Sequence, residues 1–74
     1  MADGFVHTVF KDGQWVNKIE GGADFGGPHS TKEQAAAAGR VRAMQDGVEH
    51  VIHNEDGVIS ERSSYGNDPV SRPG

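Results

Sequence analysis

Cysteine is absent from the 74 residues of this chain. That absence excludes disulfide bonds, thiolate zinc ligands and thiol catalysis together. No apolar run approaches the roughly 20 residues that span a bilayer, and the first four residues lack the basic and apolar regions of a signal peptide. We therefore expect a cytoplasmic protein that makes no membrane contact.

Large apolar side chains are scarce, since the chain has one tryptophan, one tyrosine and three phenylalanines. A chain of this length forms one domain and buries only about 60% of the surface that its unfolded form exposes. The core is therefore expected to be thin. Because disulfides are excluded, association with a second copy or with another protein is the remaining source of extra stability.

An excess of basic residues is also missing, because the formal net charge is −4. A basic surface that displaces counterions from phosphates is the usual basis of nucleic-acid binding, so the charge argues against that class. Only Lys32, Arg40 and Arg42 share one expected element. A nucleic-acid-binding module that uses these three residues is the alternative function.

Two β-hairpins are predicted, one on each side of a helix. Strands are expected at about 5–10 and 14–19, joined by an Asp-Gly turn, and again at about 49–53 and 58–62 around a second Asp-Gly. Glycine and proline make residues 20–29 a flexible loop, and little regular structure is expected in the tail, 66–74.

A helix is predicted at about 31–46. Ser30 and Glu33 have the spacing of a capping box, and Gly47 is a suitable C-terminal stop. Apolar residues recur with helical spacing and are expected to form the buried stripe: Ala37, Val41, Met44 and Val48. Gly39, inside the helix, indicates close approach to the sheet. The fold expected is α+β, a ββ-α-ββ antiparallel sheet of about four strands with one helix on one face.

Four segments resemble the DUF2188 family of small bacterial and phage proteins: Trp15–Lys18, Thr31–Ala35, Val51–Gly57 and Ser64–Pro69. Together they extend over nearly the whole chain. Asn17 departs from the resemblance, because an apolar residue is expected there. The resemblance implies the fold just described and no established biochemical activity. Related strand and helix orders also resemble double-stranded RNA-binding domains, which is an analogy of fold alone.

His50 and His53 are the candidate metal ligands, since imidazole is a common ligand and two acidic residues follow. Residues three apart on a strand face opposite sides, which argues against a shared metal. His7 and His50, at equivalent positions of the two hairpins, are expected side by side if the first and third strands pair.

No catalytic or cofactor-binding signature is present in the sequence. The glycine-rich residues 21–27 precede a helix, but they match no phosphate-binding pattern and include Asp24. The serines lack the surroundings of a nucleophile. We expect a protein that is not an enzyme and has no cofactor.

The sheet face opposite the helix is the expected partner surface, with Thr8, Lys18, His53 or Glu61 on it according to register. Trp15 and Tyr65 are further partner-surface candidates, because aromatic residues are enriched at interface centres. For Trp15, the scarcity of large side chains favours burial in the core instead. For Tyr65, the alternative is a latch that holds the tail on the sheet. The function expected is a small binding or regulatory module that acts through protein contact or homodimerisation.

Overall fold

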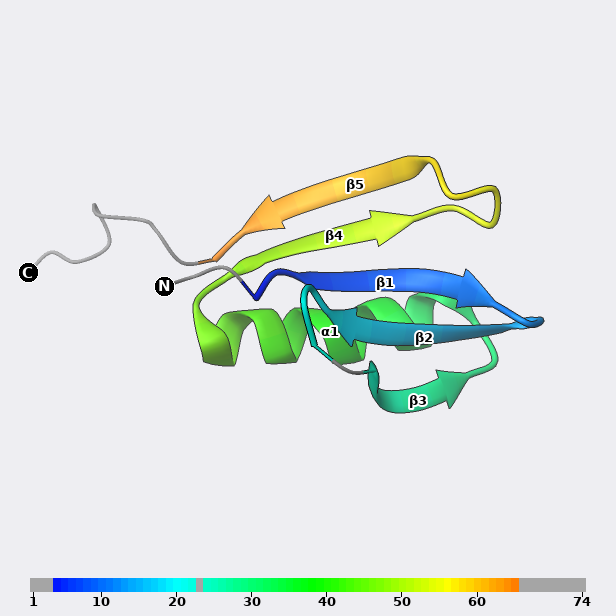
Figure 1. Cartoon of the computed structure of the whole chain (residues 1–74), viewed down its shortest axis with the longest axis horizontal. Coiled ribbons are helices and arrows are strands. Elements are labelled where there is room, and N and C mark those ends of the chain that lie inside the picture. The colour runs from blue at the N-terminus through cyan, green and yellow to red at the C-terminus, as the bar shows by residue number, and fades with distance from the viewer. Residues whose placement is uncertain (1–3, 23, 66–74) are drawn as a thin grey trace, which may run out of the picture.

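The computed structural model describes residues 4–22 and 24–65. The elements, in order, are β1 (Val6–Lys11), β2 (Gln14–Ile19), β3 (Asp24–His29), α1 (Lys32–Asp46), β4 (Glu49–His53) and β5 (Ile59–Ser64). They form one sheet of order β3-β2-β1-β4-β5 with α1 across one face (Figure 1). The predicted α+β class, with one helix on one face of the sheet, is confirmed. The predicted tail, 66–74, lies outside the described residues.

Tight turns close both hairpins. Asp12 and Gly13 have φ of 53° and 80°, which is the pair of positive values that a two-residue hairpin turn requires. In the second hairpin Gly57 has φ of 91°, and the Asn54 N–H donates to the Val58 carbonyl at 2.8 Å. The Asp-Gly sequences therefore form the turns that they predict.

β3 lies where a loop was expected, at residues 20–29. It pairs with β2 in an antiparallel register that shifts between Trp15 and Asn17, and the Gly27–Pro28 bond is cis. Pro28 is tolerated because β3 is an edge strand, which has one side free of ladder hydrogen bonds. The sequence pattern did not predict this strand, because glycine and proline have a low propensity for strands. Pairing with β2 overrides that low propensity.

The extra strand explains why the sheet is mixed. β3 carries the chain back along β2, so α1 runs the length of the sheet before β4 begins. As a result β4 runs parallel to β1, with His7 opposite Val51. The other strand pairs are antiparallel. The expectation of an antiparallel sheet of about four strands is thus corrected to five strands with one parallel pair at the centre.

The ends of α1 are capped by Thr31 and Gly47. The Thr31 hydroxyl accepts from the Gln34 N–H at 3.1 Å, one residue later than the cap expected at Ser30. Gly47 has φ of 65°, and its N–H bonds back to the Ala43 carbonyl. Across residues 4–22 and 24–65, no helix has the length and apolar character needed to cross a membrane.

The buried face of α1 consists of small residues, namely Ala35, Gly39 and Ala43. The predicted stripe is wrong in three of its four positions, because Ala37 is exposed and Val41 and Met44 are 54% and 56% exposed. Only Val48, just beyond the helix, is buried. The helix lies too close to the sheet for large side chains to fit between them.

Gly39 sets that distance. A Cβ at this position would lie 2.5 Å from Asn17 Oδ1, 2.7 Å from His50 Nε2 and 2.9 Å from Thr8 Oγ1. The prediction of close approach at Gly39 is therefore confirmed, and the atoms approached are polar.

Apolar packing is concentrated at the two ends of the helix. Val6, Ala43 and Val48 form a buried cluster, and the residues packed against it are Phe5, Phe25 and Tyr65. At the other end the Trp15 ring, 7% exposed, lies 5.1 Å from the Phe10 ring between centroids. The centre of the layer between helix and sheet is left to Thr8, Asn17 and His50.

Replacement of Gly39 by alanine tests the close approach. Alanine favours a helix by about 1 kcal/mol over glycine, yet here its methyl group forces three buried polar groups apart, so we expect a net loss of about 1–3 kcal/mol in the free energy of unfolding. Urea denaturation measures this loss. Ala37→Gly on the exposed side calibrates the propensity term, and a Gly39→Ala variant stabilised by that same amount would contradict the packing described.

Candidate functional site

His50 and His53 lie on opposite faces of the sheet, as strand alternation predicts. His50 is 2% exposed and faces the helix, whereas His53 lies on the open face. Among residues 4–22 and 24–65, no group of three or more histidine, cysteine, aspartate or glutamate side chains is arranged to hold a metal ion. The two candidate ligands therefore do not form a common site.

A directed chain of hydrogen bonds joins His50 to the helix. Asn17 Nδ2 donates to the Ala35 carbonyl at 2.9 Å, and the Thr8 hydroxyl donates to Asn17 Oδ1. The Thr8 proton is thereby used, so His50 Nε2 must donate to Thr8 Oγ1, 2.8 Å away. Thr8 is 0% exposed, which corrects its expected position on the open face.

Neutral imidazole is the form of His50 that this environment favours. Burial lowers the pKa of His50 below its ordinary value of 6.5, and the positive charge of Arg40 lowers this pKa further. The Glu61 carboxylate opposes both effects. Asn17, the departure from the family pattern, is completely buried with its side-chain hydrogen bonds formed, so this network is structural rather than accessible to a ligand.

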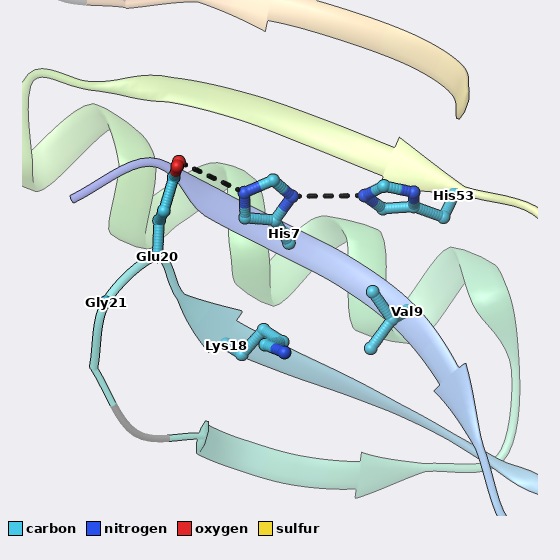
Figure 2. A pocket seen from close by; sticks show the side chains of 6 residues that line it. All are labelled: His7, Val9, Lys18, Glu20, Gly21 and His53. Carbon is cyan, nitrogen blue, oxygen red and sulfur yellow. Dashed lines mark hydrogen bonds and ion pairs between the residues drawn. The ribbon is translucent and has the colours of Figure 1, made fainter. Parts of the chain in front are cut away.

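The open face carries a hollow of about 300 Å³ (Figure 2). Its walls come from three strands that are neighbours in the sheet, β2, β1 and β4. The residues that line it are His7, Val9, Lys18, Glu20, Gly21 and His53. Lys18 and His53, two of the predicted partner-surface residues, are thus brought together on one face.

His7 and His53 both line this hollow and contact each other there. His7 Nδ1 lies 3.0 Å from His53 Nε2, and His7 Nε2 lies 3.4 Å from Glu20 Oε1. His53 Nδ1 is 3.3 Å from the Gly57 carbonyl oxygen. Sequence reasoning paired His7 with His50 instead. To predict the contact of His7 with His53, the parallel register of β1 and β4 must be known. That register follows from β3, the strand that was not predicted from the sequence.

The two aromatic partner-surface candidates belong to the helix side. Trp15 is buried against Phe10, and the Lys32 ammonium lies 5.9 Å from its ring centroid, so the core position is confirmed and the partner-surface candidate is corrected. Tyr65 is half-buried against the cluster of Val6, Ala43 and Val48, and the tail that it was expected to hold lies outside the described residues.

The three basic residues of the nucleic-acid alternative differ in their surroundings. Lys32 Nζ donates to Asn54 Oδ1 at 2.8 Å and to Ser60 Oγ at 3.1 Å. Arg42 pairs with Asp46 at 2.8 Å and lies over the Phe25 ring. Arg40 is exposed. Two of the three charges therefore already interact with groups of the same chain.

Over the part of the chain that the structure describes, the architecture is that of a small α+β domain whose helix covers one face of the sheet and leaves the other open (Figure 1). The family profile described as "Uncharacterized protein conserved in bacteria (DUF2188)" matches residues 6–65, which include every strand and the helix. The chain belongs to the DUF2188 family. No curated protein and no solved structure matches it.

The lowered pKa of His50 predicts a loss of stability in acid. Because the unfolded chain binds the His50 proton more readily, the free energy of unfolding falls once the pH drops below about 6.5, by at most about 1.4 kcal/mol per pH unit for one proton. His50→Gln retains a donor for Thr8 but does not titrate. Urea denaturation between about pH 8 and pH 5 should show a weaker acid loss in this variant, and identical profiles would contradict a buried neutral His50.

Proposed function

We propose that this domain is a non-enzymatic binding module whose open sheet face contacts a second copy of the chain. The observation that carries the proposal is a sheet face that no described element covers: within residues 4–22 and 24–65, α1 contacts β1, β2, β3 and β4 on one side, and the hollow of His7 and His53 opens on the other. The cytoplasmic location expected from the sequence is part of the proposal.

Apolar side chains on the open face support a protein partner. Val9 and Val16 lie opposite each other across β1 and β2, and both are only partly buried. Ile59, opposite His53 on β5, is 49% exposed. Burial of these partly exposed branched side chains against a partner removes water from them, which stabilises the complex.

Charges of both signs on the same face support a second copy as that partner. Lys18 and Glu20 both line the hollow, and an Arg62–Glu49 ion pair lies on β5 and β4. In a two-fold symmetric contact the same patch meets itself, so a patch with both signs brings opposite charges together. A patch of one sign would repel its own copy.

The thin core is a further argument for association. The buried apolar residues of the described chain are Val6, Trp15, Ala35, Ala43, Val48 and Val51. Two of these are alanines, and Thr8, Asn17 and His50 occupy the centre of the layer. Burial of a second apolar surface in a dimer adds to the stability that such a core supplies.

The nucleic-acid alternative receives less support. Its charges lie on the helix, where Lys32 and Arg42 are held by Asn54, Ser60 and Asp46. These contacts would have to break before Lys32 and Arg42 could bind phosphate, and their loss would offset part of the binding free energy. A duplex-RNA shift that disappears with added salt and in Arg40→Ala would favour this alternative over the dimer.

Sedimentation over a range of concentrations tests the dimer and the face it uses. We expect the mass to rise from 7.9 kDa toward twice that value. Val9→Glu buries an unpaired charge in the proposed interface and should weaken the dimer by roughly 30-fold or more. Val41→Glu, a matched change on the exposed side of α1, should leave the dimer intact.

Far-ultraviolet circular dichroism confirms that both variants are folded, so a change of mass reports association alone. Two results contradict the proposal: a wild-type chain that stays at 7.9 kDa, or a dimer that Val41→Glu breaks and Val9→Glu does not.

A further inference from the structure

The rings of His7 and His53 meet head to head. Their centroids are 5.3 Å apart and their facing nitrogens 3.0 Å apart, with 30° between the ring planes. The difference between the two distances is about the sum of the two ring radii, so the facing nitrogens lie on the line that joins the ring centres. Figure 2 shows this in-line contact. The lone pair or N–H of each facing nitrogen points directly at the other.

Both outer nitrogens of the pair face groups that only accept hydrogen bonds. His7 Nε2 faces the Glu20 carboxylate at 3.4 Å, and His53 Nδ1 faces the Gly57 carbonyl at 3.3 Å. Carboxylate and carbonyl oxygens carry no proton at neutral pH, so each outer nitrogen must supply the N–H. With both outer nitrogens protonated, two neutral rings would direct two lone pairs at each other.

This repulsion between lone pairs arises because two neutral rings hold too few protons for their contacts. Three contacts are made, to Glu20, between the rings and to Gly57, and each needs one proton. Two neutral imidazoles bring only two. We propose that His7 and His53 form a binding site for one additional proton, shared between His7 Nδ1 and His53 Nε2, so that the pair carries a single positive charge.

The surrounding groups are consistent with one charge at this position. The Glu20 carboxylate attracts it, and Lys18, opposite His7 on β2, opposes it from an exposed position. On the other side, Arg62 and Glu49 neutralise each other at 2.8 Å. The His7 side chain is 23% exposed and Val51, its neighbour on β4, is 3% exposed, so the shared proton is partly withdrawn from water.

The geometry selects a proton over a metal ion. Zinc–nitrogen bonds are about 2.0–2.1 Å long, so an in-line metal would need the two nitrogens about 4 Å apart. At 3.0 Å a metal would have to lie to one side, and the facing lone pairs do not converge on such a point. The in-line distance instead suits an N–H···N hydrogen bond.

The shared proton fixes the open face. Without it the three contacts have two protons, so one contact must break. Loss of the Glu20 contact removes one tie between β1 and the segment after β2, and loss of the Gly57 contact removes one tie between His53 and the turn that joins β4 to β5. The occupied site therefore joins β1, β4 and both segments. It does not depend on the proposed dimer.

Nuclear magnetic resonance of the ring nitrogens in ¹⁵N-labelled protein tests the proposal directly. Near pH 7, His7 Nε2 and His53 Nδ1 should have the shifts of protonated nitrogens. One further proton should show scalar coupling to both facing nitrogens, which gives three protons on the pair. A total of two protons on the pair, whichever nitrogens hold them, would overturn the proposal.

Glu20→Gln is the decisive variant. A glutamine amide can donate to His7 Nε2, after which His7 Nδ1 donates to His53 and His53 Nδ1 to Gly57, so two protons satisfy all three contacts. We expect the pair to drop from three protons to two in this variant. Glu33→Gln removes the same charge from the exposed first turn of α1 and should leave three. An unchanged count in Glu20→Gln would contradict the inference.

Zinc chloride added to chelator-treated protein near pH 7 separates the two occupants. One equivalent should leave the ring signals of His7 and His53 unshifted. A saturable shift of the His7 ring signals at one equivalent, abolished by His53→Gln and retained in His29→Gln, would identify a metal site and overturn the proposal.

Discussion

The close approach of α1 to Thr8, Asn17 and His50 at Gly39 determines much of the rest of the molecule. Only small residues fit between helix and sheet there, so Ala35 and Ala43 flank the glycine, and Val41 and Met44 are turned outward. Water is excluded from the same space, so each buried polar group must find its partner within the protein. The hydrogen-bond chain that ends on the Ala35 carbonyl satisfies this demand and fixes the helix in one position.

The same constraint gives the histidines of β4 different chemistry. His50 is enclosed under the helix, where burial favours a neutral ring with one donor directed at Thr8. His53, three residues later, lies on the open face among acceptors and charged groups. Strand alternation separates the two environments by the thickness of one sheet. The chemistry of each histidine is therefore set by the groups on its own face of the sheet, and not by its closeness to the other histidine in the sequence.

Local chemistry made parts of the fold predictable. Asp12-Gly13, Gly57 and Gly47 need positive φ, and the sequence signals for these turns and for the helix end depend on few neighbours. β3 was missed because its glycines and Pro28 become strand only through pairing with β2. The buried side of α1 was missed because large apolar residues were assumed to point inward. The contact between His7 and His53 was missed for the first of these reasons, since it requires the parallel register of β1 and β4 that β3 brings about.

The parallel pairing of β1 with β4 has a consequence for how the chain assembles. Each hairpin closes over a short loop, but β1 and β4 meet across more than thirty intervening residues that include β2, β3 and α1. Closure of a loop that long costs entropy before any contact repays it. We expect early, reversible formation of the two hairpins and the helix, with union of the halves along β1 and β4 as the slow and cooperative step. His7 and His53 lie on the two sides of that seam, so their contact forms only when the halves have joined.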